Sequence, residues 1–138
     1  MRIDKLTTKF QEALGEAQTL ALGSDHAYIT PAHVLVAMLR QDDGPKALLQ
    51  RAGVNVPGLL AAAEASVKKQ PQVQGQEQIT LDRDMGVLLQ AAEKESIKRG
   101  DQFMASELFV LAACDARGAV GDICKAHGLN RKNLQAAI

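Results

Sequence analysis

The sequence predicts an all-α domain in which two pseudo-symmetric four-helix repeats pack into one compact eight-helix unit. Hydrophobic residues make up 46% of the chain and aromatic residues only 3%, so Ala and Leu supply most of the apolar surface, as in close-packed helices. The second half of the chain also repeats the first. Gly128 follows Gly53, and Leu89 follows Leu14, by the same 75 positions (128 − 53 and 89 − 14). A length of 138 residues is sufficient for one hydrophobic core.

The other residues shared by the two repeats are apolar, which is the type that determines packing. At the same shift the matched pairs are Ala17 and Ala92, Tyr28 and Phe103, Ile29 and Met104, Ala37 and Ala112, and Leu59 and Leu134. A duplicated helical unit builds a body with a seam between its halves. Such a seam is a place where ligands bind, so it is the first candidate for a functional site.

The first helix is predicted from Thr8 to Leu22. Thr8 and Gln11 have the spacing of a capping box, and Gly23 is expected to end the helix in the left-handed conformation. One face of this helix carries residues at helical spacing, namely Phe10, Ala13, Leu14, Ala17 and Ala21.

Thr30 and Pro31 predict the N-cap and first residue of a second helix, because Pro fits where the first-turn N–H groups have no helical partner. The third helix is short and ends at Gly53. The fourth runs from about Pro57 to Lys69. These elements form repeat one, over residues 1–69.

Residues 70–79 are predicted to be a linker, because the stretch is rich in Gln, contains Pro and Gly and has no apolar period. Repeat two then covers residues 80–138. Its first helix begins at Thr80 or Asp82 and ends before Gly100. The remaining helices are expected over residues 108–114, before Gly128 and after the cap residue Asn130.

The charge balance and the missing motifs exclude several function classes. The 16 basic and 16 acidic residues cancel, so no overall field favours nucleic acid or an anionic membrane. The sequence has no phosphate-binding G-x-x-x-x-G-K-[ST] loop and no G-x-S-x-G or H-E-x-x-H motif, so neither an enzyme nor a cofactor site is expected in this segment. The N-terminus has charges in place of a signal peptide, and no apolar run could span a membrane, which predicts a cytoplasmic protein.

The cysteines and histidines are interpreted as structural. Cys114, Cys124 and His127 have the spacing C-x9-C-x2-H, which does not match a zinc site, so no metal is expected. His33 lies in the first turn of a predicted helix on its core-facing side. A small helical enzyme using Cys114 or His33 would need a base and a nucleophile within reach, and the spacing supplies neither.

A substrate-binding site is predicted along the seam. Thr7, Gln11 and Leu14 lie on one line of the first helix, and Leu88 and Leu89 lie on the repeat-related helix. Asp101 and Glu107 flank the turn before the second helix of repeat two. An acidic rim beside an apolar groove is one interpretation of these carboxylates. The alternative is that Glu107 only stabilises its helix N-terminus.

The chain resembles the N-terminal domain of the Clp unfoldases, and within that family the ClpB-type disaggregases. The resemblance covers the whole chain and is carried by segments 4–11, 17–23, 98–103 and 106–112 and by the linker residues 70–75. It implies a binding module without catalysis of its own, which captures exposed apolar segments of unfolded or aggregated polypeptides. Thr7, Asp101 and Glu107 match family positions tied to that activity.

The resemblance also implies a setting. The parent would be a homohexameric ATPase that uses ATP and Mg²⁺ outside this segment and cooperates with the DnaK chaperone system, whereas the isolated domain would be a monomer. The alternative is an adaptor-docking or substrate-docking domain of a ClpA-type or ClpC-type protease unfoldase, which the linker and the opening residues argue against. Two residues depart from the family pattern, Ala105 before the second helix of repeat two and Ala32 in repeat one, and both affect helix capping.

Overall fold

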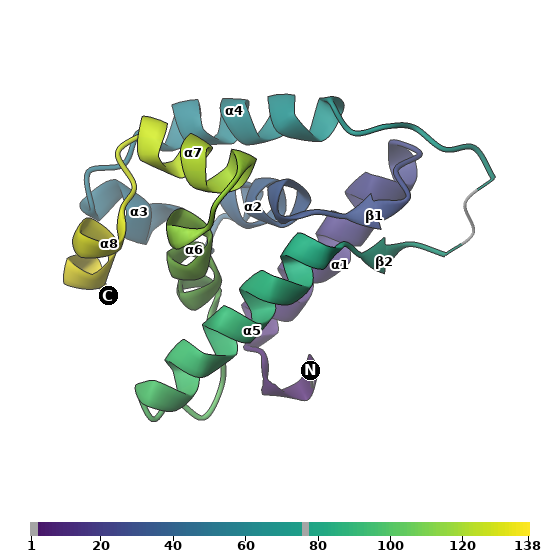
Figure 1. Ribbon diagram of the computed structural model, residues 1–138. Coiled ribbons are helices and arrows are strands. Elements are labelled where there is room, and N and C mark those ends of the chain that lie inside the picture. Colours follow the sequence, from purple (N-terminus) through teal and green to yellow (C-terminus); the bar gives the residue numbers. More distant parts are fainter. Residues whose placement is uncertain (1–2, 76–77) are drawn as a thin grey trace.

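The computed structural model describes residues 3–75 and 78–138, and in these it confirms the all-α class (Figure 1). The described residues form eight α-helices, one short 3₁₀ helix at Ile3–Lys5 and one two-stranded sheet. The helices are α1 (Thr8–Gly23), α2 (Pro31–Arg40), α3 (Lys46–Arg51), α4 (Val56–Lys68), α5 (Arg83–Lys98), α6 (Ser106–Asp115), α7 (Ala119–Ala126) and α8 (Arg131–Ala137). The strands are β1 (Tyr28–Ile29) and β2 (Thr80–Leu81).

The duplication seen in the sequence is also present in the element boundaries. Helix α5 begins and ends 75 positions after α1, and α6 begins and ends 75 positions after α2. Asn55 and Asn130 cap α4 and α8 at the same shift. Because three of the four pairs of corresponding helices start at corresponding residues, with α3 and α7 as the exception, a position in one half can be compared with its counterpart in the other.

The two halves share one core. Within each half the long helix packs on the next one, α1 on α2 and α5 on α6. Helix α4 packs on α7 and α3 on α8, and these contacts join the halves, as the helices near the top and left of Figure 1 show. In the core, the rings of Phe10 and Phe109 meet edge to face with their centroids 5.7 Å apart. These two fully buried rings come from different repeats.

Two strand-like backbone pairings between the repeats are found among the described residues. Strand β1 pairs in parallel with β2, with Ile29 opposite Leu81. The repeat-related residues Met104 and Leu6 form an isolated parallel bridge. In each case the start of one long helix is tied to the loop before the second helix of the other repeat. The sequence did not predict these pairings, because two-residue strands give no periodic signal.

The predicted capping box at the start of α1 is wrong by one residue. Thr7 is the N-cap, and its Oγ1 accepts a hydrogen bond from the Phe10 N–H at 3.3 Å. Gln11 instead directs its side-chain amide to the Leu6 carbonyl oxygen at 2.9 Å. The hydroxyl of Thr7 reaches the N3 amide, so Thr8 becomes the first helical residue.

Gly23 does not end α1 in the left-handed conformation as predicted. It is the last residue of the helix, and the positive φ of 58° is found at Asp25. The turn lets the His26 N–H donate to the Ala21 carbonyl oxygen at 2.9 Å. Asp tolerates this conformation better than most residues, so glycine is not required there.

Other predicted boundaries are confirmed. Thr30 is the N-cap of α2 with Pro31 as its first residue. Gly53, Gly100 and Gly128 have positive φ values of 86°, 74° and 85°, which fits glycine at a helix end. The described part of the predicted linker lies against the end of α1, since the Val73 N–H donates to the Asp25 carbonyl oxygen at 2.7 Å. Residues 76–77 of that linker lie outside the described residues.

Candidate functional site

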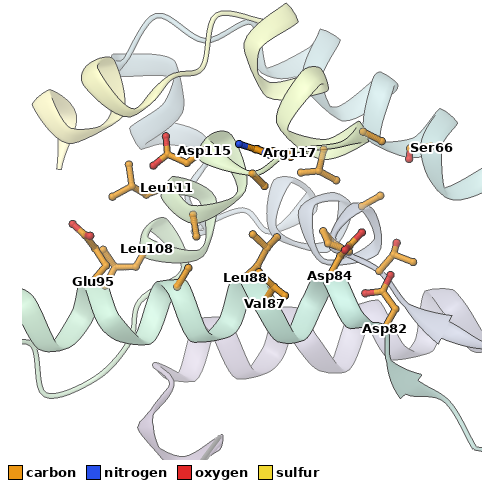
Figure 2. Close-up of a pocket in the computed structure, with 18 of the residues that line it drawn as sticks. Ser66, Asp82, Asp84, Val87, Leu88, Glu95, Leu108, Leu111, Asp115 and Arg117 are labelled. Carbon is orange, nitrogen blue, oxygen red and sulfur yellow. The ribbon is translucent and has the colours of Figure 1, made fainter.

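A hollow lies between α5 and the helices of both repeats that face it (Figure 2). Its volume is about 650 Å³. It is a groove lined by the start of α2, the end of α4, one face of α5, the inner side of α6 and the segment leading into α7. Its residues are Thr30, Pro31, Ala32, Ser66, Gln70, Asp82, Asp84, Val87, Leu88, Ala91, Glu95, Leu108, Leu111, Ala112, Asp115, Ala116, Arg117, Ala119, Val120 and Arg131.

The floor of this groove is apolar because α5 and α6 pack on each other and both contribute apolar side chains to it, Leu88 and Ala91 from α5 and Leu111 from α6. On α5 the residues Asp84, Leu88, Ala91 and Glu95 recur at three- and four-residue intervals, so they form one line along the helix. Leu88 is only 4% exposed, whereas Val87 beside it is 55% exposed. A bulky aliphatic side chain left half in solvent at the edge of an apolar groove is a feature of binding sites.

Charged residues occupy both ends of the groove. At one end Asp82 caps α5, and its Oδ1 accepts from the Met85 N–H at 2.8 Å. Partial burial raises the pKa of the Asp82 carboxyl, and the charge of neighbouring Asp84 raises it further, against the opposing effect of the Met85 hydrogen bond. Asp84 occupies the first turn of α5 on the same side, and Figure 2 shows both carboxylates at the rim.

The other end is a compact ion-pair network. The Nε of Arg131 lies 2.5 Å from Asp115 Oδ2, and its Nη1 lies 3.7 Å from Glu95 Oε1. Arg99 also pairs with Glu95, with 3.1 Å between Nε and Oε1. The hydrogen bond to Asp115 raises the pKa of the Arg131 guanidinium, so this network holds its charges in place.

A second, smaller pocket of about 420 Å³ lies at the start of α1 and α6. It contains Thr7 and Glu107 together with Lys9, whose Nζ pairs with Asp43 Oδ2 at 2.7 Å. Ser106 is 5% exposed there, and its hydroxyl has no hydrogen-bond partner among the described residues.

The two pockets are related by the internal repeat. Thr7 and Lys9 in the small pocket correspond to Asp82 and Asp84 in the groove, at the shift of 75. The residues around Ala105 at the start of α6 correspond in the same way to those around Thr30 at the start of α2. The described residues therefore present two copies of one concave feature, of which the copy in the groove is the larger.

The predicted site residues are divided among these features. Thr7 and Glu107 meet in the small pocket, and Leu88 lies in the groove. Leu89 is only 5% exposed and belongs to the core. Asp101 is exposed after Gly100, outside both pockets.

The remaining two predicted residues lie on α1. Leu14 is half-buried against the core, and neither it nor Gln11, which is exposed, lines either pocket. The prediction therefore placed Leu88 in the groove but missed Val87, Leu111 and the carboxylates Asp82 and Asp84. The shift of 75 from Thr7 to Asp82 is the signal that could have located them.

His33 forms a buried pair with His26. Its Nε2 lies 2.8 Å from His26 Nδ1, and its Nδ1 accepts the Thr30 N–H at 3.0 Å. Because a backbone N–H can only donate, Nδ1 carries no proton and Nε2 donates to His26. Burial lowers the pKa of His33 to about 4, with a further contribution from His26. These contacts are structural ones that fix the start of α2.

The cysteines are buried and free. Burial raises the pKa of Cys114 to about 11 and that of Cys124 to about 12, so both thiols stay protonated near neutral pH. Across residues 3–75 and 78–138, no cluster of three or more His, Cys, Asp or Glu side chains could hold a metal ion. No helix in the same ranges has the length and apolarity to cross a membrane.

Comparison with known proteins identifies the family. Residues 5–127 match the family model described as the Clp repeat (R) N-terminal domain.

The chain is a Clp repeat N-terminal domain.

Relatives of this Clp domain include chaperone protein ClpB of Pseudomonas putida, 38% identical over 140 residues, and that of Vibrio vulnificus, 39% identical over 140 residues. Both alignments cover 100% of this chain and 16% of the relative, so the chain spans about a sixth of their length. The fold is similar to that of the N-terminal domain of Hsp104 from Candida albicans, with a TM-score of 0.83 at 20% identity over 96% of this chain and 88% of the other. The predicted resemblance to the N-terminal domain of ClpB is confirmed.

Proposed function

We propose that this Clp domain captures exposed apolar segments of unfolded or aggregated polypeptides in the groove between α5, α6 and α7, as part of a ClpB-type disaggregase. The single observation that carries the proposal is the groove itself, with Leu88 and Leu111 on its floor and Val87 exposed at its edge. An unfolded chain differs from a folded one in its accessible apolar side chains, and an open apolar groove selects for that difference.

The groove suits weak binding with little sequence demand. Its lining includes the aliphatic side chains of Val87, Leu88 and Leu111, whose apolar contacts are not directional. We expect a Kd of roughly 10 μM to 1 mM for one domain, because a short segment in a shallow groove buries little area. Weak binding lets the segment leave for the next step.

The proposed parent is a homohexameric ATPase that works with the DnaK system, with ATP and Mg²⁺ bound outside this segment. The identity with ClpB chaperones over the whole chain supports this setting. Six domains on one ring would raise the apparent affinity through effective concentration. The predicted cytoplasmic location belongs to the same proposal.

Solved relatives support the docking of a polypeptide. One is described as a complex of the ClpV N-domain with a VipB peptide. It has a TM-score of 0.76 and 26% identity over 96% of this chain and 83% of the other. The competing proposal is adaptor docking of the ClpA or ClpC type. It differs in its ligand, because an adaptor is a folded protein that would bind without being unfolded.

The groove location can be tested with two matched substitutions on α5. Val87→Asn removes an apolar side chain at the groove edge, and Ile97→Asn removes one that is 71% exposed on the same helix and outside the groove. We expect Val87→Asn to weaken binding of a permanently unfolded client about threefold to fivefold, from the apolar contact that it loses. Ile97→Asn should leave the Kd unchanged.

The readout is a titration of the ¹⁵N-labelled domain with that client. Signals from Val87, Leu88 and Val120 should shift, since all three lie in the groove. Equal affinities for the two variants, with shifts confined to residues away from the groove, would contradict the proposal. Binding of a folded partner but not of the unfolded client would favour the adaptor role.

A further inference from the structure

The acidic side chains of the groove form two pairs that differ in how their charge is balanced. Glu95 and Asp115 share Arg131, and Glu95 also contacts Arg99. Asp82 and Asp84 at the opposite end make no salt bridge within the described part of the chain. Arg117, which also lines the groove, makes no salt bridge among the described residues either, so the charged groove residues without an ion pair are two carboxylates and one guanidinium.

The unbalanced charge lies where a cation would stabilise it. Asp82 is half-buried at the groove rim, and Asp84, two residues further along in the first turn of α5, also lines the groove. Burial and the charge of Asp84 both disfavour the ionised form of Asp82, which is why its pKa is raised. A positively charged group placed between the two carboxylates would remove that penalty.

The internal repeat shows that the fold does not need these carboxylates. At the corresponding positions of α1 stand Thr7, which caps the helix with a neutral hydroxyl, and Lys9. The first turn of α1 contains no acidic residue, yet α1 has the same length as α5. Helix capping explains an oxygen acceptor at position 82, and the helix dipole favours a carboxylate in the first turn such as Asp84, but α1 shows that a helix of this length forms without either charge.

We infer that the polypeptide segment held in the groove carries a lysine or arginine, whose cation lies against Asp82 and Asp84 while its apolar residues lie over Leu88 and Leu111. This inference rests on the proposed function and specifies the class of segment that the groove selects. Charge complementarity is its basis, because among the described groove residues that make no salt bridge, the carboxylates of Asp82 and Asp84 outnumber the single guanidinium of Arg117.

The length of the groove sets the length of the segment. From Asp84 to Glu95, α5 advances 11 residues (95 − 84), which is about 16 Å along the helix. An extended polypeptide covers that distance with about five residues. The preferred segment is thus a run of about five apolar residues with a basic residue at the end next to Asp84.

The test uses three fluorescein-labelled peptides with the same five-residue Leu-Val-Ala core. One has Lys at both ends, one has Ser and one has Glu, so that either chain direction can place an end residue at Asp82. Fluorescence anisotropy at low salt should show the Lys peptide binding about threefold to tenfold more tightly than the Ser peptide, as expected for one partly exposed ion pair. The Glu peptide should bind more weakly than the Ser peptide.

The decisive variant is Asp82→Asn with Asp84→Asn. Asn is as good an N-cap as Asp, so α5 should still form. In this variant the Lys and Ser peptides should bind with equal affinity, and the Ser peptide as in the parent domain. The matched control is Glu16→Gln with Glu93→Gln, which removes two exposed charges outside the groove and should keep the preference for Lys.

The outcomes separate the two proposals. If the Ser peptide shifts the signals of Val87 and Leu88 but the Lys peptide binds no more tightly, the charge inference is wrong and the groove function stands. A Lys preference that survives in the Asp82→Asn, Asp84→Asn variant also overturns the inference. If no peptide shifts the groove signals, the proposed function fails, and the inference fails with it.

Discussion

Gly53 and Gly128 occupy the same position in the two repeats and lie against each other: a Cβ atom on Gly128 would stand 3.6 Å from the carbonyl oxygen of Gly53. Their φ values, 86° and 85°, are nearly identical. Each follows a short helix, and close by the Asn55 N–H donates to the His127 carbonyl oxygen at 3.1 Å. The two halves are thus in contact where a glycine with positive φ follows a short helix in each half.

Replacing either glycine by valine should destabilise the domain. Gly53→Val and Gly128→Val each force a β-branched residue into a left-handed backbone conformation, which we expect to cost about 1–3 kcal/mol of unfolding free energy. Chemical denaturation of the two variants measures this loss. Gly15→Ala is the matched control, because Gly15 lies within α1 with open space around it, and alanine there should stabilise by up to about 1 kcal/mol. Unchanged stability in both valine variants would contradict the role given to these glycines.

The start of α6 offers a stabilising substitution. Ala105 is the N-cap and has the extended backbone of one, with φ −87° and ψ 160°, but its side chain cannot accept a hydrogen bond. At its counterpart Thr30, the backbone N–H and the hydroxyl both lie within hydrogen-bond distance of His33 Nδ1 at the start of α2, 3.0 and 2.7 Å away. Ala105→Asp should therefore raise the unfolding free energy by about 1 kcal/mol. A melting temperature at or below that of the parent domain would show that other contacts already satisfy the first turn.

The sequence predicted the helix boundaries better than it predicted which residues line the groove, and Leu88 and Leu89 show why. Both are apolar and adjacent on α5, and the pattern assigned both to the seam. In the structure both are buried in the core, but only Leu88 also lines the groove. Which of two neighbouring leucines faces a groove depends on the helices packed around α5, and these come from distant parts of the chain.

Boundaries were predicted where local chemistry decides them. The left-handed glycines and Asn130 act within a few residues, so their meaning can be deduced from sequence alone. The error at Gly23 has a tertiary cause, since Asp25 makes the turn that brings His26 beside His33. The pairing of β1 with β2 joins residues about fifty positions apart and left no local pattern.

The buried histidine pair predicts an acid-dependent loss of stability. The pKa of His33 is about 4 in the folded domain and about 6.5 in an unfolded chain. Below pH 6.5 the unfolded state therefore binds a proton that the folded state excludes, and the unfolding free energy falls until the pH reaches about 4. The stability that the domain gains from keeping His33 neutral is fully present above pH 6.5.

His33→Gln isolates this effect. Gln is a usual partner at this position of a capping box, so it can still accept the Thr30 N–H, but it cannot be protonated. We expect the variant to be less stable than the parent at pH 7.5, because the contact with His26 is lost. Urea unfolding measured between pH 7.5 and 4.5 should then show a shallower pH slope for the variant. Identical slopes would mean that His33 does not control the acid response.

The last prediction concerns Thr7, Asp101 and Glu107, which the family resemblance links to substrate handling. Thr7 and Glu107 share the small pocket, while Asp101 lies on the exposed turn before α6. Thr7 also caps α1, and its N–H donates to the Met104 carbonyl oxygen at 3.0 Å. A binding role must therefore be separated from a role in stability, and Thr7→Ser is the control that keeps the capping hydroxyl.

In the full-length protein, Thr7→Ala, Asp101→Ala and Glu107→Ala should each reduce reactivation of an aggregated client. Loss of the Thr7 cap should cost the isolated domain about 1 kcal/mol, which a domain of this size absorbs while staying folded. Asp101→Ala should leave its melting temperature nearly unchanged, because the Asp101 side chain is exposed. Melting of the isolated domain and reactivation by the full-length protein are measured for each variant. Reduced reactivation in a stably folded variant supports a binding role. If reactivation falls only in proportion to lost stability, these residues maintain the scaffold, and the groove along α5 alone contacts the client.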